Sequence, residues 1–140
     1  MTTAIDTNII VALWDADPVF SAAAQSALDA ALRRGGLVVC PAVFAELMAA
    51  PGRDEMFMDA FFQDTGIRVD WSPDESVWRA AGGAFQTYVA RRRRQREPTP
   101  RRILADFLIG AHALQSGHSL LTLDDRFYKV AFPDLTVTVP

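Results

Sequence analysis

Short runs of apolar residues alternate along the chain with longer stretches whose apolar residues recur at helical spacing. The apolar runs are typical of buried strands and lie at residues 2–5, 37–40, 67–71, 119–123 and 135–139. The stretches between them predict helices at residues 9–14, 18–32, 41–50, 53–64, 72 to about 91, 101–116 and 124–130. This order favours an α/β fold with a short, mostly parallel central sheet that helices cover on both faces.

Prolines mark several expected boundaries. Pro18 and Pro41 are placed to open helices, because a proline fits the first turn of a helix. Pro98 and Pro100 interrupt the chain in what we predict to be a loop within the domain. No internal repeat and no long linker divides the 140 residues, so the chain is expected to form one domain, 1–140.

Composition supports a folded chain. Half of the residues are apolar, which is enough for a substantial core, and the single cysteine, Cys40, excludes an internal disulfide framework. Charges or prolines interrupt every apolar stretch before it could span a membrane. A secretory signal begins with a positively charged region, but no basic residue precedes Arg33 in this chain. A cytoplasmic location is therefore expected.

Charge is distributed unevenly around the net value of −3. Residues 91–102 hold seven arginines and one acid, which gives +6, and the other residues hold seven basic and sixteen acidic side chains, which gives −9. Arg91, Arg92, Arg93 and Arg94 therefore form a candidate RNA-binding patch on an acidic protein. The alternative is a solvated helix end with no ligand.

Four acidic residues stand out because each lies in an otherwise apolar surrounding. Burying an unpaired carboxylate costs several kcal/mol, and no equally isolated basic residues are available to neutralise these four. They are Asp6 in residues 1–14, Glu46 in residues 37–51, Asp106 in residues 103–114, and Asp124 directly after the apolar run 120–123.

A divalent cation is a natural counter-ion for such a group. Asp6 and Asp124 follow predicted strands, and the carboxyl ends of parallel strands meet at one edge of a sheet, where ligands bind. Mg²⁺ and Mn²⁺ prefer oxygen ligands of this kind. Gly110, four residues after Asp106, is expected to leave space beside that carboxylate for a metal or a phosphate.

Each acid also has a structural explanation. Asp6 and Asp124 could cap the helices that follow them, and Glu46 could lie on a solvent-exposed edge. Asp106 could pair with Arg101 or Arg102. The coincidence of all four acids in one arrangement favours the metal site.

The chain resembles the PIN-domain ribonucleases and, more narrowly, the VapC-like toxins of type II toxin–antitoxin systems. The similarity extends over the whole length. The segments that carry it are Ile5-Asp6-Thr7-Asn8, Glu46, Ala105-Asp106-Phe107-Leu108-Ile109-Gly110-Ala111-His112-Ala113, Leu120-Leu121-Thr122-Leu123-Asp124-Asp125-Arg126-Phe127-Tyr128 and Phe132-Pro133-Asp134-Leu135.

This resemblance implies a three-layer PIN-like fold and a metal-dependent endoribonuclease that acts as a toxin. By position, Asp6, Glu46 and Asp106 would hold Mg²⁺ or Mn²⁺ and Asp124 would complete the acidic, catalytic site. The spacing from Thr122 favours Asp124 over its neighbour Asp125. Asn8 and Thr122 would be polar supports. The implied partners are an RNA substrate, an antitoxin that covers the acidic groove, and a second copy in a homodimer.

Other functions remain as alternatives. His112 and His118 could serve a metal-free nuclease, although His112 is expected on a helix face and His118 in a turn. A Mg²⁺-binding signalling module would need a lysine near its acids, and the only lysine is Lys129. A non-catalytic module that binds RNA or protein is the third alternative. Such a module would be expected to have lost some of the four acids, and all four are present.

Overall fold

The computed structural model describes residues 1–96 and 101–140. The break expected at Pro98 and Pro100 lies outside the described residues. In the described residues, strands and helices follow one another in the order that the sequence predicts. The strands are β1 (Thr3–Ile5), β2 (Leu37–Val39), β3 (Arg68–Val69), β4 (Ser119–Leu121) and β5 (Val137–Thr138). The helices are α1 (Thr7–Trp14), α2 (Ser21–Arg34), α3 (Pro41–Met48), α4 (Glu55–Thr65), α5 (Glu75–Gln95), α6 (Leu104–Gln115) and α7 (Asp125–Ala131).

Of the two helix starts expected at prolines, one is confirmed and the other is shifted by local hydrogen bonds. Helix α3 begins at Pro41 as expected, whereas α2 begins at Ser21 rather than at Pro18. The carboxylate of Asp17 accepts hydrogen bonds from the backbone N–H groups of Val19 and Phe20 at 2.8 and 2.9 Å. These bonds hold the segment in a turn, so the helix starts after it.

All five strands are parallel and follow the spatial order β3-β2-β1-β4-β5. The chain builds the sheet outward from β1 to β2 and β3, then returns to the other side of β1 with β4 and β5. The direction of building therefore reverses between β1 and β4. In open parallel sheets the crevice at the carboxyl ends of two such strands is the usual ligand site.

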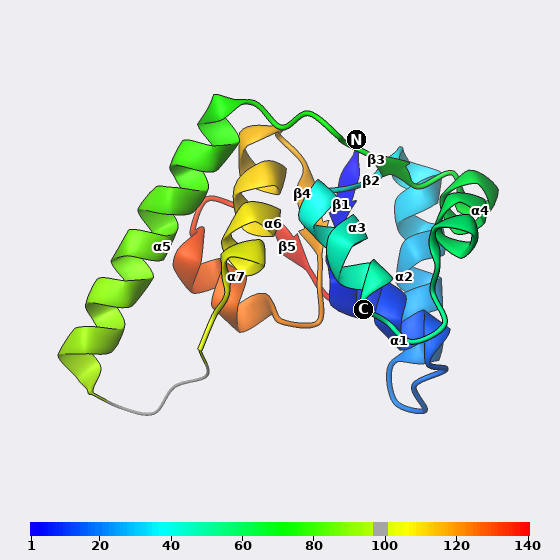
Figure 1. Ribbon diagram of the computed structural model, residues 1–140, viewed down its shortest axis with the longest axis horizontal. Coiled ribbons are helices and arrows are strands. Elements are labelled where there is room, and N and C mark those ends of the chain that lie inside the picture. Colours follow the sequence, from blue (N-terminus) through cyan, green and yellow to red (C-terminus); the bar gives the residue numbers. More distant parts are fainter. Residues whose placement is uncertain (97–100) are drawn as a thin grey trace.

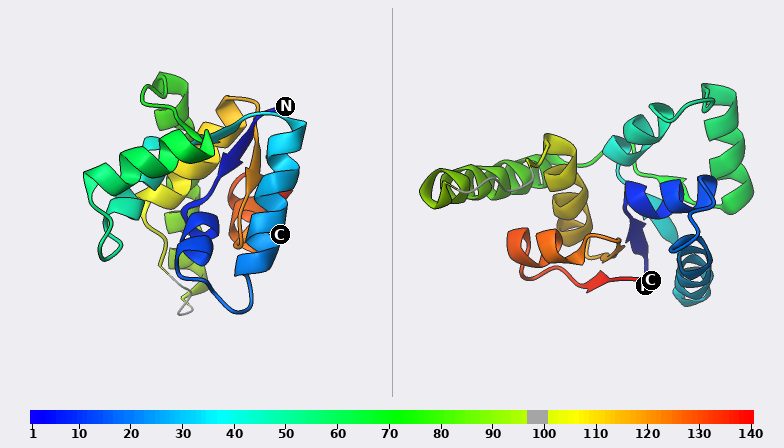
Figure 2. Two further views of the ribbon diagram at one scale, coloured as in Figure 1. Left: turned by 90° about the vertical axis from the view of Figure 1, so that its right-hand side faces the viewer. Right: turned by 90° about the horizontal axis from the view of Figure 1, so that it is seen from below.

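The helices lie on both sides of the sheet, which confirms the expected layered α/β architecture. Figure 1 shows α5, α6 and α7 on one side and α2 and α4 on the other, and Figure 2 shows the same separation from below. Helix α3 contacts both α1 and α6, and α5 packs along α6. No helix in residues 1–96 and 101–140 has the length and apolar character that a membrane span requires.

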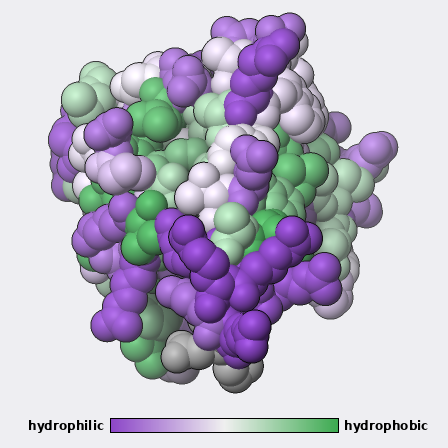
Figure 3. Space-filling model, turned by 90° about the vertical axis from the view of Figure 1, so that its left-hand side faces the viewer, coloured by the Kyte–Doolittle hydropathy of each residue, from purple (hydrophilic) through white to green (hydrophobic). Residues whose placement is uncertain are grey.

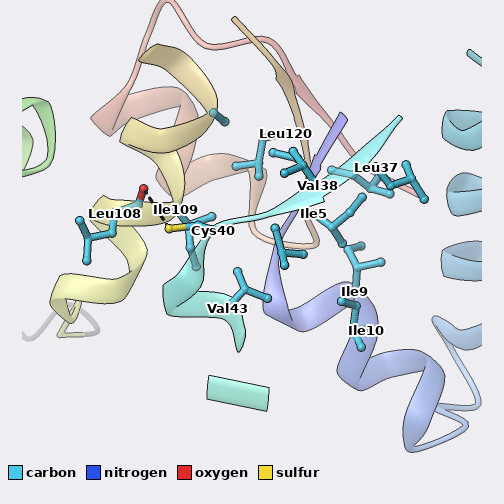
Figure 4. Packing of buried hydrophobic residues seen from close by; sticks show 14 of the residues in the cluster. Ile5, Ile9, Ile10, Leu37, Val38, Cys40, Val43, Leu108, Ile109 and Leu120 are labelled. Carbon is cyan, nitrogen blue, oxygen red and sulfur yellow. Dashed lines mark hydrogen bonds between the residues drawn. The ribbon is translucent and has the colours of Figure 1, made fainter. Parts of the chain in front are cut away.

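The core lies where the central strands meet α1, α3 and α6. Ile5, Val38 and Leu120 come from three neighbouring strands and are almost completely buried. Figure 4 shows them packed with side chains of α1 and α3, and it shows the Cys40 thiol directed at the backbone carbonyl of Leu108, 3.9 Å away. Burial raises the pKa of the Cys40 thiol to about 11, so this cysteine belongs to the core and is not a reactive nucleophile.

The space beside Gly110 is filled, which makes the expectation of a metal or phosphate there wrong. A Cβ atom at Gly110 would lie only 2.3 Å from the ring of Phe132, a buried residue that follows α7. The glycine therefore allows α6 to approach the end of α7 closely.

We expect Gly110→Ala to lower the free energy of unfolding by about 2 kcal/mol, because the added methyl group must displace a buried ring. Gly82→Ala is the matched control, since Gly82 is an exposed residue of α5 with open space around its Cβ position. The control should raise stability by up to about 1 kcal/mol through helix propensity. Urea unfolding of both variants measures the two effects, and an equally stable Gly110→Ala protein would contradict the packing described here.

Candidate metal and catalytic site

Asp6 is the innermost acid of the candidate site. It follows β1 directly and its residue is only 6% exposed. Its carboxylate accepts a hydrogen bond from the Thr122 hydroxyl at 2.7 Å and one from the Asn8 side-chain amide at 3.3 Å. Although Asp6 occupies the N-cap position of α1, its side chain makes no capping hydrogen bond. Helix capping therefore does not explain this carboxylate.

The environment of Asp6 disfavours its charged form. Burial, and to a smaller extent the negative charge of Asp106, raise the pKa of Asp6 to about 6, although the hydrogen bond from Thr122 opposes the shift. Within residues 1–96 and 101–140, no basic side chain forms an ion pair with Asp6. The carboxylate thus has neutral donors only, and near pH 7 its negative charge is uncompensated.

Thr122 and Asn8 connect the ends of the two central strands. The Thr122 hydroxyl donates to Asp6 and accepts the backbone N–H of Asp124 at 2.9 Å. The side-chain carbonyl of Asn8 accepts the backbone N–H of Leu123 at 3.1 Å, and its amide donates to Thr122 at 3.3 Å. These bonds fix the position of Asp6 relative to the segment that carries Asp124.

Asp106 and Asp124 lie near each other and share one nearby cation. Burial and the charge of Asp124 raise the pKa of Asp106, while Arg102 and the backbone N–H of Ile103 lower it. Arg102 forms its ion pair with Asp124, at 2.5 Å, and not with Asp106. In residues 1–96 and 101–140 no ion pair joins Asp106 to Arg101 either, so the alternative of a pair between Asp106 and one of these arginines is wrong. Asp124 is the N-cap of α7 but makes no capping hydrogen bond with its side chain.

Glu46 reaches the same edge of the sheet from α3. It is half-buried, and its carboxylate accepts a hydrogen bond from the Thr7 hydroxyl at 2.7 Å. Thr7 is the residue after Asp6, so Glu46 lies beside the segment that carries the innermost acid. The alternative that Glu46 lies on a solvent-exposed edge therefore does not fit its burial and its hydrogen bond.

Tyr128 is a site residue that the sequence reasoning did not single out. Burial raises the pKa of its phenol, and so do the negative charges of Asp6, Asp106 and Asp124. The three carboxylates are therefore all close to one buried hydroxyl. In the described part of the chain this hydroxyl has no hydrogen-bond partner of normal geometry, although it is near enough to Asp6 to lower the pKa of that carboxyl. Its aromatic neighbours in the sequence gave no signal that set it apart from a core residue.

The two histidines lie in a different environment. His112 is fully buried, and its Nε2 atom is 2.9 Å from the carboxylate of Asp70, which follows β3. Its ring also contacts that of His118, with 5.9 Å between centroids. Neither histidine is hydrogen-bonded to any of the four acids in the described residues. This geometry gives no support to a histidine-based nuclease.

The arginine run occupies the C-terminal end of α5. Arg91 and Arg92 line a groove between α5 and α7, and Arg92 and Arg93 line a smaller one next to it. Arg93 and Arg94 are exposed. Figure 3 shows hydrophilic side chains gathered over the lower part of this face, with hydrophobic surface between them. Cations at the end of a helix are also favoured by the helix dipole, so position alone does not establish RNA binding.

The donor chemistry fits a divalent cation. In the described residues, no group of three or more acidic, histidine or cysteine side chains is placed so that it could hold a metal ion by itself. Mg²⁺ does not require one, because it keeps several waters and is commonly held by one or two carboxylates. Asp6 and Asp106 offer oxygen ligands only, and the Asp6 carboxylate is buried without a cationic partner.

Comparison with protein-family models gives a match to the PIN domain over residues 3–133. The chain therefore belongs to the PIN-domain family. No curated protein matches it in sequence.

Solved structures with a similar fold include three toxin–antitoxin complexes. VapBC2 from Rickettsia felis, bound to a DNA fragment from its promoter, has a chain with a TM-score of 0.69 and 17% identity, and the alignment covers 100% of this chain and 99% of that one. VapBC-1 from nontypeable Haemophilus influenzae has a chain with a TM-score of 0.66 and 18% identity, and the alignment covers 99% of this chain and 98% of that one. A toxin–antitoxin complex from Klebsiella pneumoniae has a chain with a TM-score of 0.67 and 16% identity, and the alignment covers 97% of this chain and 95% of that one. At these identities the likeness concerns the fold.

The raised pKa of Asp6 predicts a pH dependence of stability. The native chain keeps this proton between about pH 4 and 6, where the unfolded chain has lost it, so the free energy of unfolding falls as the pH rises through this window. Above pH 6 the charged Asp6 carboxylate lowers the free energy of unfolding by about 3 kcal/mol. We expect Asp6→Asn to remove this loss and to be more stable than the parent protein at pH 7.5 in EDTA.

Urea unfolding between pH 4 and 8 measures the effect. Asp59→Asn, at an exposed position of α4, is the control and should keep the parent's pH dependence. If Asp6→Asn unfolds with the same pH dependence as the parent, the carboxylate of Asp6 is not the source of the penalty.

Proposed function

We propose that the chain is a metal-dependent endoribonuclease and the toxin of a toxin–antitoxin pair. The observation that carries the proposal is the buried carboxylate of Asp6, which lies at the reversal point of the sheet, near Asp106, with no cationic partner in the described residues. A bound cation would compensate this carboxylate, and the described chain provides no basic side chain that does so. Membership of the PIN-domain family supports a nuclease.

In this proposal Asp6, Glu46 and Asp106 hold Mg²⁺ or Mn²⁺, and Asp124 completes the acidic site. The bound ion would lower the pKa of a water molecule and neutralise charge on the attacked phosphate. Thr122 and Asn8 keep the carboxylate of Asp6 in one orientation through their hydrogen bonds. Thr7 does the same for Glu46. The Tyr128 phenol, with its raised pKa, stays protonated and offers an O–H donor to the carboxylates.

The proposed partners are an RNA substrate, a cognate antitoxin and a second copy of the chain in a homodimer. The named complexes with a similar fold, in which toxin and antitoxin chains are found together, support the antitoxin. An acidic site with uncompensated charge suits a partner that inserts a basic side chain. We place this activity in the cytoplasm, where an RNA-cleaving toxin meets its substrate.

The alternative of a Mg²⁺-binding signalling module has less support. The only lysine of the chain, Lys129, pairs with Asp125 at 2.7 Å on α7. That lysine is bound to a half-buried neighbour on its own helix and not to any of the four acids.

We expect Asp106→Asn to reduce RNA cleavage by more than about a hundredfold while leaving the fold intact, because it removes a charged metal ligand at a half-exposed position. The measurement is cleavage of total cellular RNA by purified protein with Mg²⁺ or Mn²⁺, with a parallel reaction in excess EDTA. The parent protein should produce discrete fragments only with metal.

Asp59→Asn is again the matched control and should cleave like the parent. An Asp106→Asn protein with full activity would refute the assigned site. A folded parent protein, free of antitoxin, that cleaves no RNA with either metal would refute the nuclease and favour a module that only binds.

The proposed role of the arginine run gives a separate prediction. Replacing Arg91, Arg92, Arg93 and Arg94 by Gln should weaken RNA binding and flatten its salt dependence, by roughly 0.7 in slope for each lost phosphate contact on single-stranded RNA. Titrations at several salt concentrations measure the slope. Replacing Arg33 and Arg34, at the end of α2, is the control for general loss of charge. An unchanged slope in the α5 variant would make the run a solvated helix end.

A further inference from the structure

Arg102 is held rigidly at the edge of the acidic site. Its guanidinium donates to the Asp124 carboxylate at 2.5 Å and lies 4.5 Å from the ring centroid of Phe127. Its backbone N–H donates to the Tyr88 hydroxyl on α5 at 2.9 Å. Three contacts, from α5 and from the first turn and N-cap of α7, thus fix one arginine, and its side chain is still 25% exposed.

The position of Arg102 joins two regions of opposite charge. On one side it lies close enough to Asp106 to lower the pKa of that carboxyl. On the other side it lines the groove between α5 and α7 together with Arg91, Arg92 and Arg126. Among the described residues it is the only basic side chain in an ion pair with one of the four acids. It therefore lies where a polyanion from the basic groove would meet the carboxylates.

The chemistry of the side chain suits a phosphate as a second ligand. A guanidinium carries five N–H donors in one plane, and the hydrogen bond to Asp124 uses one of them. The planar fork matches the oxygens of a phosphate better than an ammonium does. The acids would otherwise repel a phosphodiester, so a fixed cation beside them favours its approach.

We propose that Arg102 binds a phosphate group of single-stranded RNA next to the acidic site, through guanidinium N–H groups other than the one bonded to Asp124. The inference rests on the proposed function, because it names the residue that would place the RNA at the nuclease site. Arg102 is then a substrate-binding residue in addition to a counter-ion.

The decisive comparison uses two proteins that both lack the ion pair. Asp124→Asn frees Arg102, and the double variant Asp124→Asn with Arg102→Gln removes both partners, so neither protein leaves an unpaired acid at position 124. Binding of a fluorescently labelled short single-stranded RNA is measured by anisotropy in EDTA, so that no cleavage occurs. We expect the double variant to bind about tenfold more weakly than Asp124→Asn, with a salt slope lower by about 0.7.

Two further variants separate RNA binding from a structural role. Asp124→Asn with Arg79→Gln is the charge-matched control, since Arg79 is an exposed residue of α5 paired with Glu75, and it should bind like Asp124→Asn alone. Asp124→Asn with Arg102→Lys keeps the charge and should retain most of the salt slope while losing part of the affinity.

Equal RNA affinity and equal salt slope in Asp124→Asn and its Arg102→Gln derivative would overturn the proposal and leave Arg102 as a counter-ion of Asp124. A parent protein that binds no RNA would overturn it as well. The proposed nuclease activity is judged separately, by metal-dependent cleavage with the parent protein. The two ideas can therefore fail independently.

Discussion

The arrangement at the edge of the sheet depends on one unfavourable interaction, the burial of the Asp6 carboxylate. Its pKa is raised because water is excluded from it and because Asp106 lies nearby. Thr122 and Asn8 reduce this cost with hydrogen bonds, but hydrogen bonds from neutral groups do not remove a negative charge. The fold thus keeps a group that opposes its own stability near neutral pH. Such a group is expected where a site is built for a cation that binds after folding.

The topology of the sheet explains why Asp6 and Asp124 lie at the same edge although they are far apart in the sequence. Asp6 and Asp124 follow β1 and β4, which are neighbours in the sheet and run parallel. Asp106 comes from the first turn of α6 and Glu46 from α3, and these two helices contact each other. The reversal between β1 and β4 leaves a crevice at their carboxyl ends. Two strand ends and two helices can therefore contribute one acid each without any change of the core.

Much of this could be predicted from the sequence, because isolated acids in apolar segments are a strong pattern. The order of the strands and helices followed from periodicity. Asp6, Glu46, Asp106 and Asp124 were selected by the lack of other charges around them, and their role as a metal site stays a prediction. Three-dimensional pairings could not be predicted in the same way. Gly110 packs against Phe132, which lies 22 residues further along the chain, and no local pattern encodes that contact.

The same limit applies to the polar side chains around the acids. Thr7 and Tyr128 have ordinary neighbours in the sequence, and only the fold shows that one binds Glu46 and the other lies among three carboxylates. Arg102 lies one turn before Asp106 in the sequence, and a pair between the two was one alternative. It bonds to Asp124 instead, because the start of α7 places that carboxylate within its reach.

The pairing of Arg102 with Asp124 determines which acids stay negatively charged when no ion is bound. Its ion pair neutralises Asp124, whereas its effect on Asp106 acts only through the field, and Asp6 has no basic partner in residues 1–96 and 101–140. The uncompensated charge thus remains on Asp6, Asp106 and Glu46, and Asp6 is the most deeply buried of the three. A divalent cation and an inserted basic side chain of a protein partner would both be attracted to this same place. Under the proposed function, a single electrostatic deficit would account for both metal binding and inhibition, because either occupant would exclude the other.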